Sequence, residues 1–354
     1  MLLIWLLNTA VMKMNKLVEL PIYEPIYKTY QYQGSGAAII DSNNPIRNWY
    51  LNEIMLLKCT RAFFKGWGSP GIDIVNSSLQ DNPYLEKNKV PLKVLKGCTN
   101  QMIRNFIDLG YYVYFTEVDD YYIKNKSLYK ERHLYHDGLI CGYDKSNKTY
   151  CIYAHDSNWV YRKFWTPEIC FTNGCKSALK KQKYVNIFTL KVKNQDVEFS
   201  LTQVYNNLLK YLDSNLEKYP VDSDGIVYGI VVHTYISEYI MKLFRGEISY
   251  RFADWRILRL IWEHKKVMLE RIVVIEKKLD LDNTLSELYK AIVKEADNIR
   301  MFYASYCMKR RDSILLIISK KLLTIEARER EILTQLLQVM KEDIEDGTLE
   351  ASKK

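Results

Sequence analysis

Residues 133–156 read HLYHDGLICGYDKSNKTYCIYAHD, and this pattern predicts a β-hairpin. Residues 139–141 form a short apolar run typical of a buried strand, 144–148 form a polar turn, and 150–154 are apolar and aromatic again. Two such runs joined by a short polar turn should pair antiparallel. The other predicted strands and helices lie before and after this hairpin in the sequence.

Ionisable side chains stand at the ends of the two predicted strands. His136 enters the first strand and Asp156 leaves the second, so both should lie at the open end of the hairpin although 20 residues separate them (156 − 136). A carboxylate there can orient an imidazole and stabilise its charged form, which supplies two thirds of a Cys-His-Asp triad. Asp137 and Asp144 are alternative orienting groups, and Asp144 ranks last because it lies at the turn.

The same residues resemble a known family. The pattern His-Asp-x-Leu-Ile-x-Gly-Tyr-Asp, a polar turn, an aromatic strand and then Asp156 resembles the histidine half of papain-like, C39-type cysteine peptidases. It is most similar to the N-terminal domain of the butirosin biosynthesis protein H group, found in bacterial peptide and aminoglycoside antibiotic gene clusters. Further resemblance covers residues 48–53, 107–114, 255–258 and 263–265.

This resemblance implies a papain-like α+β domain. In an active member, a cysteine thiolate would take an acyl group from a carrier-protein thioester, with His136 as the base and Asp156 as the orienting carboxylate. A peptidase-like reaction is the other enzymatic outcome, and neither reaction requires a cofactor.

The position that the resemblance assigns to the nucleophile holds no thiol. In the papain-like topology the nucleophile lies at the N-terminus of the first central helix, where the helix dipole lowers the thiol pKa. Apolar spacing predicts that helix over 49–60, and residues 43–53 contain no cysteine. The sequence therefore fits a non-catalytic descendant, a pseudoenzyme that binds a peptide, an acyl carrier or a partner protein in the cleft, slightly better than a working transferase.

Two other thiols are candidate nucleophiles. Cys98 directly precedes a predicted helix that runs to residue 109, so its thiolate would gain from the helix-terminal amides. Cys59 falls near the C-terminal end of the predicted 49–60 helix, where the dipole raises a thiol pKa. Buried cysteines usually behave as small hydrophobes, so a structural role is the simpler interpretation of both.

Composition indicates a folded protein of two units. The chain has 354 residues, of which 48% are hydrophobic and 26% charged. The seven cysteines are irregularly spaced and do not form a disulfide framework, which favours a reducing cytoplasm. Cys170 and Cys175 have no second cysteine pair or nearby histidine, so they do not predict a zinc site. The net charge of +9 suits an acidic partner such as an acyl carrier protein. Lysines are spread along the chain rather than grouped with exposed aromatics, which argues against nucleic-acid binding.

Strand signals concentrate before residue 194 and helix signals after it. The strongest strand is predicted at 111–118, with others at 37–40, 159–165 and 184–192. Amphipathic helices are predicted at 200–216, 225–244, 255–278, 283–309 and 313–343. We therefore expect an antiparallel-sheet domain over 20–193, a helical bundle over 194–343 and a charged tail over 344–354. The bundle suggests a homodimer, and a helical dimerisation scaffold is a third functional hypothesis.

Residues 1–19 are an N-terminal extension of uncertain structure. Residues 1–7 are apolar, but they are too few to span a bilayer and lack the basic flank of a secretory signal. Met14 is an alternative start to Met1. We therefore expect no membrane association.

Overall fold

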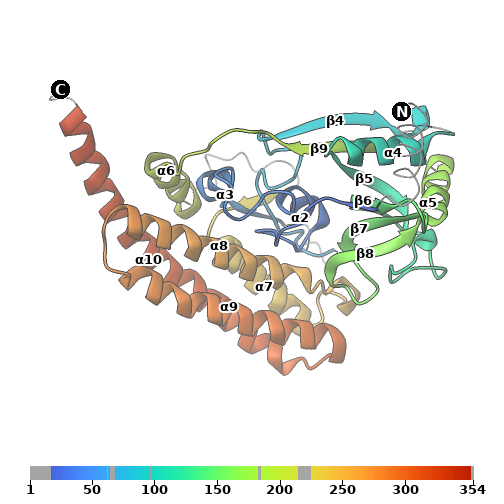
Figure 1. Ribbon diagram of the computed structural model, residues 1–354. Helices are drawn as coiled ribbons and strands as arrows, with labels where there is room; N and C mark the ends of the chain where they lie inside the picture. The colour runs from blue at the N-terminus through green and yellow to red at the C-terminus, as the bar shows by residue number, and fades with distance from the viewer. Residues whose placement is uncertain are drawn as a thin grey trace. The chain divides into compact units, whose positions relative to one another are not determined.

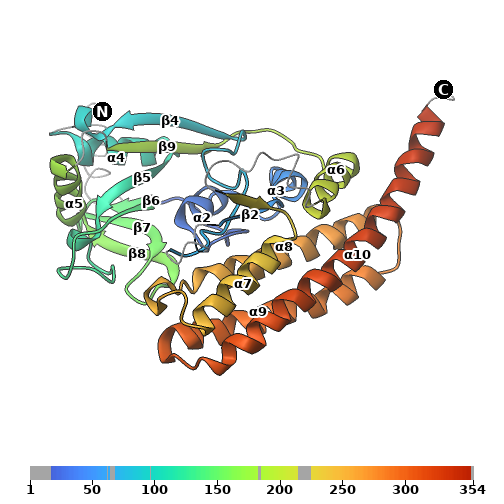
Figure 2. The same ribbon diagram turned by 180° about the vertical axis from the view of Figure 1, so that it is seen from behind.

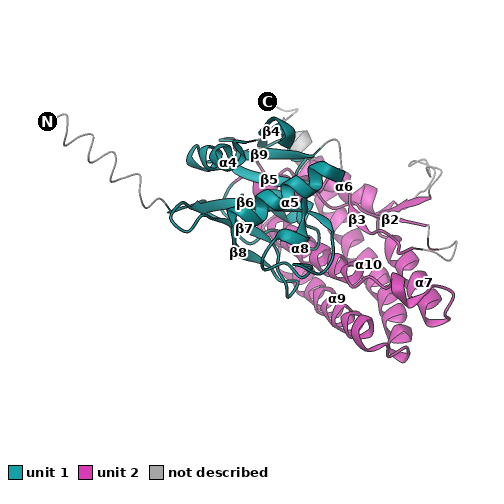
Figure 3. Ribbon diagram, turned by 90° about the vertical axis from the view of Figure 1, so that its right-hand side faces the viewer, with its two compact units in different colours: residues 1–44, 78–195 teal, residues 45–77, 196–354 magenta. Residues whose placement is uncertain are grey.

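The structure is a computed structural model that describes residues 17–61, 63, 68–95, 97–181, 185–213 and 225–351. The predicted 1–19 extension lies largely outside these residues. The described chain is α+β, which confirms the predicted class, and it divides into two compact units (Figure 3). The first unit holds the described residues up to Asn44 together with Ser78–Gln195, and the second holds Pro45–Ser77 and the chain from Asp196 onward. None of the helices in these ranges combines the length and apolar character needed to cross a bilayer.

The first unit is built on a seven-stranded antiparallel sheet (Figure 1). Six strands follow the order β4-β9-β5-β6-β7-β8, and β1 pairs with β6. Their bounds are β1 Leu17–Glu19, β4 Leu85–Pro91, β5 Tyr112–Asp119, β6 Tyr135–Asp144, β7 Thr149–His155, β8 Tyr161–Pro167 and β9 Asn186–Val192.

Strands β6 and β7 are the predicted hairpin, which the structure confirms. Leu139 pairs with Tyr153 and Asp144 with Thr149, with one register shift between Ile140 and Gly142. Asp144 closes the turn by accepting hydrogen bonds from the backbone N–H groups of Asn147 and Ser146, and these bonds lower the pKa of Asp144. The strand predicted at 111–118 is β5, which pairs with β6 on the other side.

Helices cover both faces of this sheet. Helices α4 (Thr99–Asp108) and α5 (Glu168–Lys181) cover one face through a shared apolar core. Strand residues in that core include Val113, Phe115, Ile140, Ile152, Ala154 and Phe164. Helix α2 (Gln31–Ala37) packs on β6 and β7, and it contacts Tyr161, whose odd spacing from Phe164 places it on the opposite face. A Cβ on Gly34 would lie 2.6 Å from the Tyr161 ring, so this contact requires a glycine.

Two predicted elements near the N-terminus are wrong. Residues 37–40, predicted as a strand, are the end of α2 and the turn after it. The helix predicted over 49–60 is α3 (Arg47–Glu53), and residues 57–60 form strand β2 (Leu57–Thr60). Strand β2 pairs with β10 (Ile226–Tyr228) and β3 (Asp73–Ile74), and this distant pairing overrides a local apolar spacing that also suited a helix.

The second unit joins α3 and this small sheet to five longer helices. These are α6 (Leu201–Leu212), α7 (Val232–Phe244), α8 (Arg256–Lys278), α9 (Thr284–Lys309) and α10 (Ser313–Ala351). Helix α10 packs along α7 and α9, and α8 packs along α9 (Figure 2). The five predicted helices are therefore present, although β10 occupies the beginning of the predicted 225–244 helix.

The unit boundaries differ from the predicted domains, because residues 45–77 belong with the C-terminal helices instead of the sheet. The buried Arg271 of α8 explains part of this arrangement. Its guanidinium donates to the backbone carbonyls of Leu51, Tyr50 and Ile54 at the end of α3, at 2.5, 3.2 and 3.1 Å. Carbonyls at the end of a helix lack some of their intrahelical donors. Tyr50 O accepts from the Ile54 N–H, and Arg271 supplies a further donor to each of the three carbonyls.

A buried ion pair joins the helices of the second unit. Lys265 Nζ of α8 lies 2.5 Å from Glu329 Oε2 of α10. Lys265 also donates to the Tyr211 hydroxyl of α6 at 3.0 Å, and the Tyr289 hydroxyl of α9 donates to Glu329. Burial alone would raise the pKa of Glu329, but Lys265 and the other donors lower it. Side chains of four helices, α6, α8, α9 and α10, therefore meet at this buried ion pair.

Two buried histidines border this ion pair. His264 Nε2 donates to the Met55 carbonyl at 2.7 Å, which leaves Nδ1 facing Lys265 Nζ at 3.4 Å. His233 Nδ1 donates to the Ile230 carbonyl at 2.7 Å, and its Nε2 lies 3.9 Å from Glu329. Burial and Lys265 lower the pKa of His233 to about 4, and the same causes lower that of His264. Both imidazoles are neutral at pH 7.

We predict that acid destabilises the second unit through His233. Its pKa falls from 6.5 in the unfolded chain to about 4 in the folded chain, so the unfolded state takes up the proton first. The free energy of unfolding should therefore fall as the pH decreases from about 6.5 to 4, by about 3 kcal/mol from this group. His233→Gln keeps a side-chain donor for the Ile230 carbonyl but cannot titrate. In this variant the free energy of unfolding should depend less on pH between about 6.5 and 4. Denaturant unfolding followed by the helical circular dichroism signal measures it, and equal slopes in both proteins would contradict the assignment.

Candidate functional site

The open end of the β6–β7 hairpin gathers charged side chains of the first unit. Asp120 lies in the short helix η3 (Asp120–Tyr122), Lys126 follows it, His136 and Asp137 lie at the start of β6, and Asp156 follows β7. Asp120, Lys126 and Asp156 are each at most 5% exposed. Buried charges persist only when they are paired or hydrogen-bonded, so the partners of each define what the site can do.

His136 is paired with Asp120. Its Nδ1 lies 2.6 Å from Asp120 Oδ2, and about a third of the imidazole is exposed. The predicted partner was Asp156, so the structure replaces that carboxylate with another. The cause is the register of β5 and β6: Val118 pairs with His136, which brings the residues just after β5 beside the imidazole.

Asp156 instead holds the turn between β7 and β8. It accepts hydrogen bonds from the backbone N–H groups of Asn158 and Val160 at 2.8 and 3.0 Å, and from Arg162 Nε at 2.5 Å. Burial alone would raise the pKa of Asp156, but these hydrogen bonds lower it below the ordinary value. Its oxygens are occupied, so it positions a loop instead of an imidazole.

Lys126 is the buried cation of the site. Its Nζ lies 3.8 Å from Asp120 Oδ1. Burial lowers the pKa of Lys126, and the carboxylates of Asp120, Asp137 and Asp156 act in the opposite direction. The ammonium group is therefore paired with Asp120 and is also stabilised by the charges of Asp137 and Asp156.

Asp137 connects the sheet to α2. Its Oδ2 accepts from the Tyr114 hydroxyl at 2.6 Å, and its Oδ1 accepts from Gln31 Nε2 at 2.9 Å. Gln31 Oε1 in turn accepts from the backbone N–H of His155 at 3.0 Å. Burial raises the pKa of Asp137, against the lowering effect of Tyr114 and Lys126. The first residue of α2 is therefore bonded to both strands of the hairpin.

The structure pairs neither candidate thiol with His136. Cys59 is on β2 in the second unit, and burial raises the pKa of its thiol to about 12. Cys98 is exposed at the N-terminus of α4, and its Sγ donates to the Leu95 carbonyl at 3.5 Å. Within the described ranges, no hydrogen bond joins a cysteine to His136. Among the same residues, no cluster of three or more histidine, cysteine, aspartate or glutamate side chains could hold a metal ion.

A second histidine–carboxylate pair lies beside the first. His133, just before β6, has its Nδ1 2.7 Å from Asp119 Oδ2, and the Ser177 hydroxyl donates to the same oxygen at 2.6 Å. The His133 ring also stacks on Tyr121. Neither Asp119 nor Asp120 was predicted as a partner of a histidine. The available signal was two adjacent acids at the end of the strongest predicted strand, which lies opposite the start of the hairpin when the strands are antiparallel.

No protein-family model matches the chain, and no curated protein matches it. The resemblance to the butirosin biosynthesis protein H group therefore stands on the sequence motifs alone.

We predict that Tyr114→Phe destabilises the first unit by about 1–3 kcal/mol, because it removes a donor from the buried carboxyl of Asp137. Tyr143→Phe is a matched control on the same sheet, since the Tyr143 hydroxyl donates to Asp108, which is exposed and can turn to water. The control substitution should lower the free energy of unfolding by about 0.5 kcal/mol or less. Chemical denaturation measures both, and equal losses would contradict a special role for Asp137.

Proposed function

We propose that this chain is a papain-like accessory protein of a bacterial natural-product or peptide pathway, similar to the butirosin biosynthesis protein H group, that binds a partner without catalysis. One observation carries the proposal. The helix predicted to carry the nucleophile is α3, which belongs to the second unit and has no cysteine. The helix that packs on the sheet beside the hairpin is α2, which also has no cysteine and begins with Gln31, whose amide is bonded to Asp137 and His155.

The chemistry of acyl transfer supports this choice. A thioester is cleaved by a nucleophile that can lose a proton to a neighbouring base, and a glutamine amide cannot do so. His136 is oriented by Asp120 as a base would be, but no hydrogen bond joins it to a thiol in the described part of the chain.

Exposed side chains at the same end of the hairpin favour binding. Trp159 and Val160 lie at the tip of the β7–β8 turn and are 52% and 49% exposed. Trp159 adopts a φ of 58°, a conformation that bulky residues rarely take, and Asp156 maintains the turn that imposes it. Exposed tryptophans are frequent anchors of protein interfaces. The net charge of +9 makes an acidic acyl carrier protein the preferred partner.

Two other functions each have one supporting observation. An acyltransferase that uses Cys98 is supported by the exposure of that thiol. A dimerisation scaffold is supported by exposed apolar side chains on α9 and α10, namely Met301, Phe302, Met308, Leu316 and Ile317. Mass measurement in solution separates the scaffold from a monomer.

The absence of a catalytic pair predicts the behaviour of the cysteines. Alkylation of each thiol, resolved by mass spectrometry across pH in the native protein and in His136→Ala, should show no thiol whose rate depends on His136. Cys59 should be inert while the protein is folded, because burial holds its pKa near 12. Reaction of Cys98 that is fast at low pH and lost without His136 would instead establish an acyltransferase-type pair.

The binding proposal predicts that Trp159→Ala weakens association with a purified holo acyl carrier protein by about 10- to 100-fold, as expected for loss of an interface anchor. Trp165→Ala, a change of the same size on β8, is the matched control and should alter the dissociation constant by less than about threefold. Calorimetry provides the constants. Equal effects of the two variants, or no association at all, would reject the carrier as the partner at this turn.

A further inference from the structure

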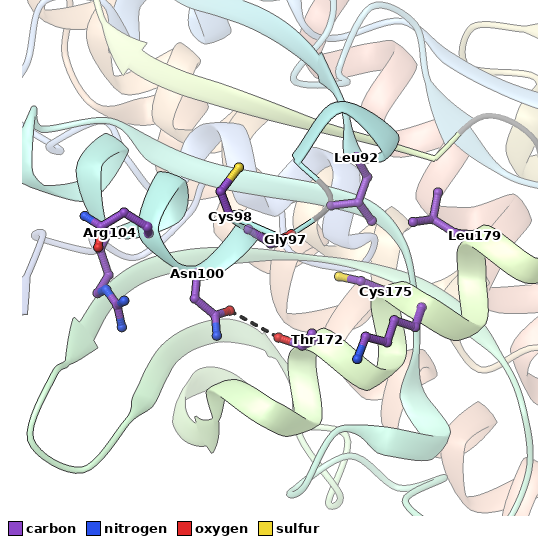
Figure 4. Close-up of a pocket in the computed structure, with 11 residues that line it drawn as sticks. Leu92, Gly97, Cys98, Asn100, Arg104, Thr172, Cys175 and Leu179 are labelled. Carbon is purple, nitrogen blue, oxygen red and sulfur yellow. Dashed lines mark hydrogen bonds between the residues drawn. The ribbon is translucent and has the colours of Figure 1, made fainter.

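A cavity in the first unit lies outside the hairpin end. Its volume is about 440 Å³, within the range of small-molecule pockets, and it is lined by the first turns of α4, the middle of α5 and Leu92 of the short helix η2 (Leu92–Leu95) (Figure 4). The function proposed above uses none of these residues. The chemistry of the lining therefore has to be explained separately.

The charged residues of this lining are all basic. Arg104 and Lys176 contribute to the wall, and no aspartate or glutamate does. Arg104 is held by Glu168, whose two oxygens lie 2.8 and 3.1 Å from its Nη1, so its charge is largely compensated. Lys176 is exposed and forms no ion pair with any residue that the structure describes. Lys176 therefore gives the cavity a net positive charge.

The remaining lining combines polar donors with an apolar side. Asn100 and Thr172 bridge α4 and α5 by a hydrogen bond of 3.1 Å, and both face the cavity (Figure 4). Leu92 and Leu179 supply apolar surface, and so does Cys175, which is 4% exposed. Burial raises the pKa of Cys175, so its thiol stays uncharged at neutral pH.

The cavity also meets the start of a ten-residue helix. Cys98, the residue before α4, makes no side-chain cap to the first turn. The backbone N–H groups of that turn carry the positive end of the helix dipole, which adds to the charge of Lys176. The polar rim and the apolar side together match a ligand with a charged head and an apolar body.

We propose that this cavity binds a small organic anion, with its carboxylate or phosphate group beside Lys176 and the first turn of α4 and its apolar part against Leu92 and Leu179. The site is independent of the hairpin end, and it would still exist if the chain had no acyl carrier partner. Cys98 is one of the lining residues and its thiol is exposed, so slower alkylation of Cys98 would report on occupancy.

The test compares three probes that share one tail: hexanoate, hexyl phosphate and hexan-1-ol. At least one of the anions should bind more than about fivefold tighter than hexan-1-ol and should slow the alkylation of Cys98 by iodoacetamide. The preferred head group then distinguishes a carboxylate ligand from a phosphate ligand. Equal binding of all three probes, or no anion binding at millimolar concentration, would overturn the proposal.

Two charge-reversal variants make the test specific. Lys176→Glu should weaken binding of the anion by at least about fivefold, whereas Lys180→Glu, on the same helix but outside the lining, should leave it unchanged. Equal losses in both variants would show a general charge effect and reject the site. Leu179→Trp fills the cavity and should abolish Cys98 protection while the circular dichroism spectrum stays native. Protection that survives in this folded variant would also overturn the proposal.

Discussion

The hydrogen bond from Gln31 to Asp137 fixes the first unit around its hairpin. A carboxyl group withdrawn from water needs donors, and Asp137 receives them from Tyr114 on the sheet and from Gln31 on α2. Gln31 also accepts from the backbone of His155 on β7, so one side chain ties the helix to both hairpin strands. The close approach of Gly34 to Tyr161 completes this attachment one turn later. The N-terminus of α2 therefore has a structural role, because the Gln31 amide holds the helix against the hairpin.

In the second unit, too, buried charged groups are stabilised by specific polar partners. Its helices meet at Lys265 and Glu329, each fully buried, and hydroxyl groups of Tyr211 and Tyr289 satisfy the remaining bonding capacity. Removing one member of such a pair is expected to cost several kcal/mol, because the other charge would remain buried alone. The bundle therefore depends on specific polar partners as well as on its apolar stripes. Burial and the charge of Lys265 also keep His233 and His264 neutral there.

The sequence predicted most where local periodicity and tertiary structure agree. The hairpin, β5 and the long helices show strong periods of 2 or 3.6, and each was found. It failed where a distant partner decides the outcome: residues 57–60 joined a strand over 160 residues away instead of extending a helix. The site was partly predictable for the same reason. The alternation of apolar and polar residues located the open end of the hairpin. It could not show that Asp120, and not Asp156, reaches His136, because that depends on the register between β5 and β6.

The separation of thiol and imidazole decides how the site can be interpreted. His136 has an orienting carboxylate and no described thiol partner, whereas Cys98 has an exposed thiol, a basic cavity and no described imidazole partner. Triad chemistry requires both groups within hydrogen-bond reach of one reacting atom. Each half can still perform recognition, since an exposed tryptophan turn suits a protein surface and a positively charged cavity suits a small anion. The two binding sites that we propose for this unit would use residues that a single catalytic centre would leave unused.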